Sequence, residues 1–427
     1  MHTNPTAAIA ATPPKTPEKT AAKIDGCIEL FLLLPLLFAI NNILYYLMSY
    51  DVAIIGGGIS GLYCALKLSP NLKVILFESN DYFGGRIKTN VDPHFEIGAG
   101  RFNEQHVLFC KLLREFNLTF IPLSNKMDYI DKIDGLIPHA NEYYSYYLKK
   151  ITSHNSEKMR EITFYQHCIN EVGKEIADHI INIHGYIGDI KNINAYDGII
   201  MHKKHNGKYF VAKEGFGELC KRMVETMKIT KLLNHSVSFV KKEGDLFRVD
   251  NVLAKRVIFA VPPKHLHFPI LKPLYPLFES VESIPLLRIY ANYPEAWLQN
   301  TTVTDHVSRR IIPIRDGLIM IAYADGEHIK PFMNNGKLKK TSELKKIISE
   351  ELNNLFPNIK IPPPNYFKPF LWDIGYHSWK AKYNSHSIIK KLLGLQGIYI
   401  CGEAFSLKQG WVEGALQSAE HVVKSIL

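Results

Sequence analysis

The chain has 427 residues, of which 46% are hydrophobic and 22% are charged. A single hydrophobic core usually stops growing at roughly 250–300 residues, so we expect two domains. The net charge of +10 is spread along the chain in short clusters such as Lys339-Lys340 and Lys390-Lys391. Such clusters usually form solvated surfaces, so we expect no nucleic-acid partner.

The six cysteines are scattered, without a CxxC pair or any spacing typical of a metal site. We therefore expect no bound metal. Cys64 and Cys110 lie within apolar patterns of helical period, and we expect both thiols to be buried. Free buried thiols suit a reducing compartment better than a secreted location.

The N-terminal region has two parts. Residues 1–26 are rich in Ala, Pro, Thr and Lys, and we expect an irregular tail. Residues 27–48 are apolar, but their strongest stretch, Leu30–Ile40, is shorter than a membrane span. Several interpretations stay open: Met48 is the functional start of a cytoplasmic protein, residues 27–48 anchor the chain to a membrane, or they form a peripheral helix.

Residues 51–78 have the pattern strand, glycine turn, helix, strand and acid. The turn reads Gly56-Gly57-Gly58-Ile59-Ser60-Gly61, and the second strand ends at Glu78. Gly56 permits the tight turn, Gly58 lets the backbone approach a pyrophosphate, and Gly61 lets the helix pack on the strand. The helix N-terminus favours phosphates, and Glu78 can accept hydrogen bonds from ribose hydroxyls. This unit predicts a bound dinucleotide, either FAD or NAD.

The continuation, Glu78-Ser79-Asn80-Asp81-Tyr82-Phe83-Gly84-Gly85-Arg86, resembles the second glycine motif of the flavin-containing amine oxidases. The resemblance extends in the family's order over most of residues 50–427. Its most specific part is Gly402-Glu403 followed by Gly410-Trp411-Val412-Glu413-Gly414-Ala415. It implies FAD as the cofactor and an α/β fold, in which a Rossmann-like FAD-binding domain of discontinuous segments carries an inserted substrate domain with a mixed sheet.

The same order of motifs implies the domain boundaries. We expect residues 50–115, 205–268 and 370–427 to form the FAD-binding domain. Residues 116–204 and 269–369 are expected to form the substrate domain, with residues 1–49 outside both.

The resemblance implies that FAD is held by the glycine motifs, a flavin-facing turn, an adenine-contacting strand at Val237–Val240 and the C-terminal motif. The expected cofactor-binding residues are Gly56, Gly58, Ile59, Ser60, Gly61, Glu78, Ser79, Gly84, Gly85, Arg86, Gly98, Ala99, Gly100, Arg101, Val237, Gly402, Glu403, Trp411, Val412 and Ala415. Residues 372–379 contain no cysteine of the kind that attaches the flavin in monoamine oxidases. We therefore expect FAD to be bound non-covalently.

Four residues are candidates for the catalytic side of the site. Trp411, Tyr376 and Trp379 are expected to form aromatic walls that align an amine, as the resemblance implies. Arg288 stands where many family members have a lysine that holds a water near flavin N5. Arginine is bulkier and always charged, so that water is held differently or oxidation is altered. The alternative for Arg288 is a surface cation on an edge strand.

Arg101 follows Gly98-Ala99-Gly100, in a segment that resembles the corresponding part of L-amino-acid oxidases. The resemblance implies that Arg101 binds a substrate carboxylate, because the planar guanidinium pairs with two carboxylate oxygens. The alternative is that Arg101 pairs with a protein carboxylate or with the FAD phosphates.

The resemblance implies oxidation of a C–N bond, with hydride transfer to the flavin, hydrolysis of the imine and hydrogen peroxide formed from dioxygen. A primary, secondary or polyamine is the first expectation, and an α-amino acid is the alternative. Two further alternatives stay open: a desaturase or protoporphyrinogen-type oxidase, and a flavin-binding module with little activity.

Overall fold

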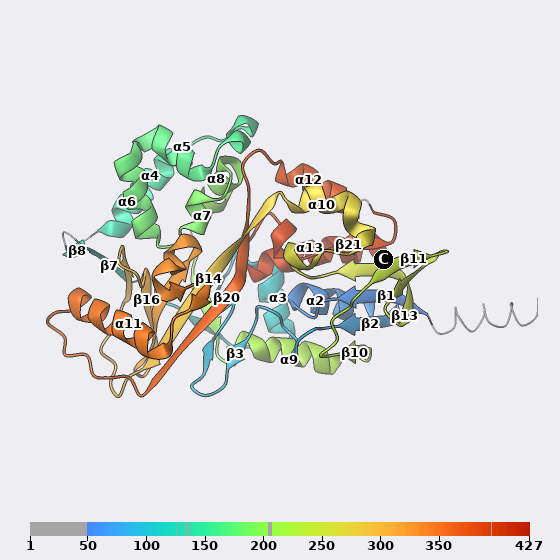
Figure 1. Cartoon of the computed structure of the whole chain (residues 1–427), viewed down its shortest axis with the longest axis horizontal. Helices are drawn as coiled ribbons and strands as arrows, with labels where there is room; N and C mark the ends of the chain where they lie inside the picture. Colours follow the sequence, from blue (N-terminus) through green and yellow to red (C-terminus); the bar gives the residue numbers. More distant parts are fainter. Residues whose placement is uncertain (1–48, 125, 133–134, 138, 204–206, 394) are drawn as a thin grey trace, which may run out of the picture. The chain divides into compact units, whose positions relative to one another are not determined.

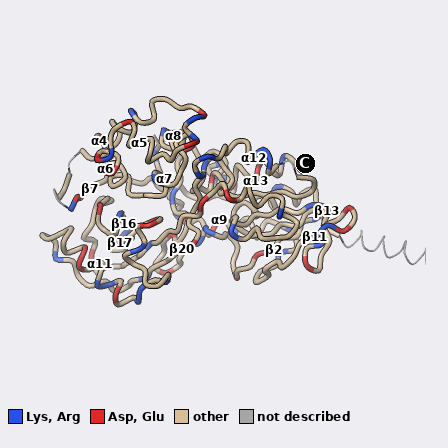
Figure 2. The backbone as a smooth tube through the Cα atoms, turned by 45° about the horizontal axis from the view of Figure 1, so that its top comes forward, with Lys and Arg blue, Asp and Glu red and all other residues tan. Residues whose placement is uncertain are grey.

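The computed structural model describes residues 49–124, 126–132, 135–137, 139–203, 207–393 and 395–427. Our expectations for the tail, the apolar segment 27–48 and a start at Met48 lie outside these residues. Among the described helices, none has both the length and the apolar composition needed to cross a bilayer. Figure 2 shows Lys and Arg interspersed with Asp and Glu along the backbone.

The first sheet has the parallel core that the strand–turn–helix–strand pattern predicts (Figure 1). Strand β1 (Tyr50–Ile55) pairs in parallel with β2 (Val74–Phe77) and with β13 (Val252–Phe259). Strand β10 (Thr230–Leu232) extends the sheet beyond β2, and β21 (Ile398–Ile400) pairs in parallel with the second half of β13. An antiparallel hairpin of β11 (Val240–Glu243) and β12 (Leu246–Val249) completes the sheet.

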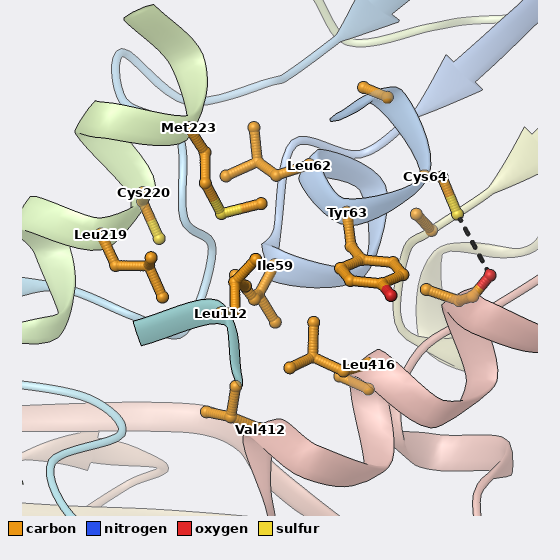
Figure 3. Close-up of a cluster of buried hydrophobic side chains, with 14 of the residues drawn as sticks. Ile59, Leu62, Tyr63, Cys64, Leu112, Leu219, Cys220, Met223, Val412 and Leu416 are labelled. Carbon is orange, nitrogen blue, oxygen red and sulfur yellow. Dashed lines mark hydrogen bonds between the residues drawn. The ribbon is translucent and has the colours of Figure 1, made fainter. Parts of the chain in front are cut away.

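Helices cover both faces of the first sheet. On one face lie α2 (Ile59–Leu68), α3 (Val107–Glu115), α9 (Phe216–Thr226) and α13 (Val412–Ile426). Figure 3 shows their apolar side chains meeting, with Leu62 from α2, Met223 from α9 and Leu416 from α13. On the other face lie η2 (Pro263–His265), η3 (Pro269–Leu274), α10 (Tyr275–Phe278) and α12 (Ser385–Leu393). Because both faces are covered, β1 reads as a continuous apolar run.

The described cysteines are free and buried, which confirms the expectation for Cys64 and Cys110. Helix α2 places Cys64 beside Cys401, with 4.0 Å between the two sulfur atoms. The helix ends at Leu68 because Pro70 follows and cannot continue it.

The second sheet is mixed, as expected. Its strands in spatial order are β20 (Tyr366–Trp379), β14 (Val281–Asn292), β17 (Leu318–Asp325), β16 (Arg310–Arg315), β15 (Thr301–Thr304), β7 (Met127–Asp131) and β8 (Gly135–Ile137). Only the pairing of β15 with β7 is parallel among the described pairs of this sheet. Helix α11 (Thr341–Leu355) packs its apolar side chains, such as Leu344 and Ile348, on the sheet.

Strands β14 and β20 form a long ribbon that connects the two sheets. Val281 and Trp379, which pair at one end of the ribbon, pack in the core of the first sheet. The rest of β20 stays paired with β14 in the second sheet. Residues 370–379, which we assigned to the FAD-binding domain, therefore belong to the second sheet.

A group of helices packs beside the second sheet: α4 (Ala140–Ile151), α5 (Phe164–Val172), α6 (Lys174–His184), α7 (Gly188–Lys191) and α8 (Ala195–Lys203). The remaining elements are short: β3 (Thr89–Asn90), β4 (Phe95–Glu96), β5 (Phe102–Asn103), β6 (Phe120–Pro122), η1 (Glu157–Glu161), β9 (Tyr209–Ala212), η4 (Gly326–Phe332), β18 (Met333–Asn334), β19 (Lys337–Leu338) and η5 (Glu403–Phe405). The mixed α/β architecture confirms the expected fold class.

Candidate active site

The glycine turn after β1 brings the backbone into positions that side chains would block. Gly56 has a φ of +106°, which favours glycine. A Cβ on Gly61 would lie 1.9 Å from the carbonyl oxygen of Gly56, so only glycine lets α2 start this close to β1. A Cβ on Gly58 would meet only the Gly85 Cα, at 4.0 Å. No side chain caps the start of α2, where Ile59 and Ser60 lie, so its first N–H groups can bind an anion.

Glu78 lies buried at the end of β2, beside this turn. Its carboxylate accepts hydrogen bonds from the N–H of Gly57 at 2.7 Å and of Asn80 at 2.8 Å, and from the Ser79 hydroxyl at 3.3 Å. The second glycine motif lies next to it, because the Gly84 N–H donates to the Gly57 carbonyl at 2.8 Å. The residues predicted from both glycine motifs are thus brought together.

Arg86 and Glu403 join the second glycine motif to the C-terminal motif. The Arg86 guanidinium lies 2.7 Å from the Glu403 carboxylate, which also accepts from His377 Nδ1 at 2.5 Å and the Gly410 N–H at 2.9 Å. Burial alone would raise the pKa of Glu403, but Arg86 and His377 hold that pKa well below its usual range. The two residues were predicted as separate cofactor contacts, and the structure adds that they form an ion pair.

Gly98, Ala99 and Gly100 form the turn predicted to face the flavin. A Cβ on Gly98 would lie 1.8 Å from the Arg86 carbonyl oxygen, and the Ala99 N–H donates to that oxygen at 3.0 Å. Gly100 lies against the side chain of Glu96. The turn is therefore held directly against the second glycine motif.

Arg288 supports the same turn from β14. Its Nη1 donates to the carbonyl oxygens of Glu96, at 3.2 Å, and of Gly98. Its Nη2 donates to the Tyr323 hydroxyl at 3.0 Å. Arg288 is 7% exposed, and β14 lies between β20 and β17. The alternative of a surface cation on an edge strand is therefore wrong.

Arg101 lies among aromatic rings. Its Nη2 donates to the Tyr186 hydroxyl at 3.1 Å, and its guanidinium carbon lies 5.6 Å from the ring centroids of Tyr186 and Tyr209. The ring of Trp411 lies 5.9 Å away. No ion pair links Arg101 to a carboxylate of the described residues, so they give no support to the alternative of a protein carboxylate as its partner.

Two more arginines approach Tyr186 or its neighbour Tyr323. The guanidinium of Arg310 lies 4.6 Å from the Tyr186 ring, that of Arg288 lies 4.6 Å from the Tyr323 ring, and these rings are 5.0 Å apart. We call this set the arginine–tyrosine cluster; its members are Arg101, Arg288, Arg310, Tyr186, Tyr209 and Tyr323. Burial alone would raise the pKa of Tyr186, but Arg101 and Arg310 hold that pKa below its usual value.

Tyr376 lies beside the C-terminal motif, as predicted for an aromatic wall. A Cβ on Gly410 would lie 3.6 Å from its ring. Its hydroxyl donates to the carboxylate of Asp325, which also accepts the N–H groups of Ile187 at 2.9 Å and Gly188 at 3.0 Å. Asp325 thus links Tyr376 to the segment that carries Tyr186.

The structure does not place Trp379 in this aromatic wall. The side chain is 1% exposed, its indole N–H donates to the Ser406 carbonyl at 2.8 Å, and its ring packs near Phe405. Tyr376 and Trp379 are three residues apart on one strand, so they point to opposite faces. One face meets the Gly410-Trp411 turn and the other meets the core.

The C-terminal motif combines an open backbone with a packed helix. Gly402 has a φ of +140°, and a Cβ there would meet nothing within 4 Å. Val412 and Ala415 are buried among the helices of the first core, so only their backbone can face a ligand. Figure 3 shows Val412 there. No side chain caps α13, whose N-cap residue is Trp411.

The adenine-contacting strand is shorter than expected. We predicted it over Val237–Val240, but β11 starts only at Val240. The reason is Asp250, whose carboxylate accepts the N–H groups of Ser238 at 3.0 Å and Phe239 at 3.1 Å. Val237 packs on the core of the first sheet, and its contact with adenine stays a prediction.

The comparisons with known proteins agree with this geometry. The family model described as "flavin containing amine oxidoreductase" matches residues 59–427. The chain belongs to this family. Achacin of Lissachatina fulica is 22% identical, over 88% of this chain and 92% of its own length.

Solved structures show the same fold. A wild-type putrescine oxidase bound to putrescine has a TM-score of 0.72 and 17% identity, covering 88% of this chain and 99% of that chain. A double mutant of putrescine oxidase has a TM-score of 0.73 and 18% identity, covering 89% and 99%. The chain is therefore an FAD-dependent oxidoreductase of the amine oxidoreductase family.

The residues of this amine oxidoreductase fit an FAD. The uncapped start of α2 suits the phosphates, and the buried carboxylate of Glu78 suits the ribose. Gly402 leaves open space where a side chain would stand. His377 Nε2 is buried without a hydrogen-bond partner among the described residues, as expected for a group that meets a ligand.

Proposed function

We propose that this amine oxidoreductase oxidises the C–N bond of an α-amino acid and that Arg101 binds the substrate carboxylate. The observation that carries the proposal is the arginine–tyrosine cluster, in which three guanidinium groups lie together with no ion pair to a carboxylate among the described residues. Buried charges are normally paired, so an anionic substrate group would complete the cluster. A polyamine, our first expectation, would bring positive charge toward three cations.

The side chains around Arg101 support this assignment. The rings of Tyr209 and Trp411 lie 5.6 and 5.9 Å from the half-buried guanidinium, and these apolar surroundings strengthen its attraction for a carboxylate. Tyr376 lies against Gly410, with its hydroxyl held by Asp325. These rings orient the amine, and an apolar surrounding favours its neutral form.

The bound FAD supplies the two-electron acceptor for the reaction. Arg288 sets the position of the turn from Glu96 to Gly98 through its carbonyl oxygens, and the Arg86–Glu403 pair holds the opposite motif. We infer non-covalent attachment, because residues 372–379 contain no cysteine, and dioxygen as the final electron acceptor.

Anaerobic mixing of the FAD-loaded protein with amines, polyamines and L-amino acids tests the proposal, with flavin absorbance as the readout. We expect amino acids to bleach the flavin and Arg101→Met to abolish that bleaching. Bleaching by polyamines alone would contradict the proposal. If nothing in the panel bleaches the flavin, a lipid or tetrapyrrole oxidase or a flavin-binding module becomes the better interpretation.

The cellular location stays a prediction. If Met48 is the start the protein is cytoplasmic, and if residues 27–48 are present they anchor it to a membrane. N-terminal sequencing of the natively expressed protein distinguishes these cases.

A further inference from the structure

Arg310, at the start of β16, is a buried cation without an acidic partner among the described residues. It is 8% exposed, and its Nε atom has no hydrogen-bond partner among them. The polar contact of its Nη2 is with the sulfur of Met127, at 3.3 Å. A thioether is a weak acceptor, and the other side chain that interacts with the guanidinium is Tyr186, so no carboxylate of the described residues offsets the charge of Arg310.

The fold holds Arg310 toward Tyr186. Gly185, which ends α6 with a φ of +80°, lies against its aliphatic stem: a Cβ at Gly185 would come within 3.1 Å of Cγ. The preceding residue, Arg309, is directed elsewhere, because its Nη2 donates to Asn182 at 3.2 Å. The side chain of Arg310 is therefore held in position by contact with Gly185 in the α6–α7 connection.

Arg310 and Arg101 both approach Tyr186. Their guanidinium carbons lie 4.6 and 5.6 Å from the same ring centroid, so one short molecule can reach both cations. Arg310 is buried and Arg101 is half-buried, and two such cations beside one ring repel each other unless negative charge lies between or beside them. One substrate carboxylate at Arg101 would leave the charge of Arg310 uncompensated.

We propose that Arg310 binds a second carboxylate of the substrate, so that the enzyme acts on α-amino dicarboxylic acids of the size of aspartate or glutamate. This inference rests on the proposed function, in which Arg101 binds the first carboxylate. The planar guanidinium of Arg310 pairs with two carboxylate oxygens. Tyr186 stands beside both guanidinium groups.

Matched pairs of substrates test the inference in the wild-type, FAD-loaded chain. L-Glutamate and L-glutamine have nearly the same shape and differ in one charge, as do L-aspartate and L-asparagine. We expect kcat/KM for flavin reduction to be at least about tenfold higher for each acid than for its amide, because a charge-assisted hydrogen bond contributes about that factor. Equal values within both pairs would overturn the inference.

Variants assign the effect to Arg310. Arg310→Met, which keeps the length of the stem, is expected to lower kcat/KM for L-glutamate by about tenfold to a hundredfold and to lower that for L-glutamine much less. Arg310→Lys is expected to recover part of the loss. Arg315→Met is the matched control, because Arg315 is exposed on the same strand and donates to the His94 carbonyl. An equal loss for acid and amide in Arg310→Met would contradict the assignment.

A binding measurement separates this inference from the proposed function. Glutarate has two carboxylates and no amino group, and butyrate has one carboxylate. We expect glutarate to perturb the flavin absorption spectrum at lower concentration than butyrate, and Arg310→Met to remove that difference. If amino acids reduce the flavin but glutarate and butyrate bind alike, the second site is wrong and the proposed function stands. If no amino acid reduces the flavin, the proposed function fails, whatever glutarate does.

Discussion

The cofactor end of the first sheet is formed mainly by backbone groups, whereas the arginine–tyrosine cluster is formed by side chains. At the cofactor end, glycines such as Gly56 and Gly61 bring backbone groups together over a few consecutive residues. The cluster is built from side chains of widely separated segments, from Arg101 to Tyr323. A site made of backbone leaves a local motif in the sequence, whereas a site made of side chains depends on the assembled fold.

The largest expected effect concerns the charged network around Glu403. This network lies at the cofactor end but is made of side chains, so it is an exception to the contrast above. Glu403→Ala leaves Arg86 and His377 without their shared acceptor. Removing one partner of a buried ion pair costs about 3–5 kcal/mol of the free energy of unfolding. Urea unfolding of the variant measures the loss, and absorbance at the flavin band measures its FAD content.

Glu115→Ala is the control for that variant, because Glu115 pairs with Lys67 at the surface. A surface pair contributes at most about 1 kcal/mol. If the two variants lose the same stability, the network around Glu403 has no special role.

The second prediction sharpens the role of the backbone. Gly61→Ala is expected to destabilise the protein by about 1–3 kcal/mol, because the new methyl group overlaps the Gly56 carbonyl. Gly58→Ala is expected to change apoprotein stability by less than about 1 kcal/mol and to weaken FAD binding. Thermal unfolding without FAD and titration with FAD separate the two effects. Equal behaviour of the two variants would contradict the assignment of Gly58 to the cofactor.

The smallest expected effect concerns a buried carboxyl near the second region, that of Glu351 on α11, which contacts Ser308 two residues before Arg310. Burial raises the pKa of Glu351 to about 7, although Ser308 donates to both of its oxygens. A carboxyl whose pKa is higher when folded contributes stability below the unfolded pKa, and that contribution is lost as pH rises through about 7. Glu351→Gln should therefore gain about 1–2 kcal/mol relative to the wild type between pH 5 and pH 8. Urea unfolding at the two pH values tests this, and a pH-independent difference would contradict it.

The fold and the cofactor motifs could be predicted because their signals are local. Apolar runs, glycine spacing and a terminal acid are enough to predict β1, α2 and β2, and the family resemblance extended that prediction. The strand from Val237 was placed too early because Asp250, ten residues beyond β11's start at Val240, sets where the ladder begins. That contact is not visible in the local sequence.

The assembled part of the site could not be predicted in the same way. Tyr186, Tyr209 and Arg310 carry no motif, and their proximity depends on how α6, β9 and β16 pack. One feature of the composition could have indicated the buried cations: the chain has 11 arginines beside 40 lysines. Four arginines and no lysine are buried among the described residues, namely Arg160, Arg288, Arg309 and Arg310. In a lysine-rich chain, arginine marks positions where a fixed planar cation is needed.

The alternation of side chains along a strand is a second signal that can be recognised in the sequence. Tyr376 and Trp379 are an odd number of residues apart within one extended run, so they cannot face the same side of a sheet. Assigning the run to a strand was sufficient to exclude that both face one aromatic wall, and the contact of Tyr376 with Gly410 favours Tyr376 for that prediction.

The central claim is that Arg101 selects a carboxylate on the amine, and one matched pair tests it most directly. L-Glutamate and 4-aminobutyrate differ only in the α-carboxylate, so their rates of anaerobic flavin reduction isolate its contribution. We predict that the wild type prefers L-glutamate by about tenfold or more and that Arg101→Met removes this preference. Preference for 4-aminobutyrate, or a preference for L-glutamate that survives in Arg101→Met, would contradict the account.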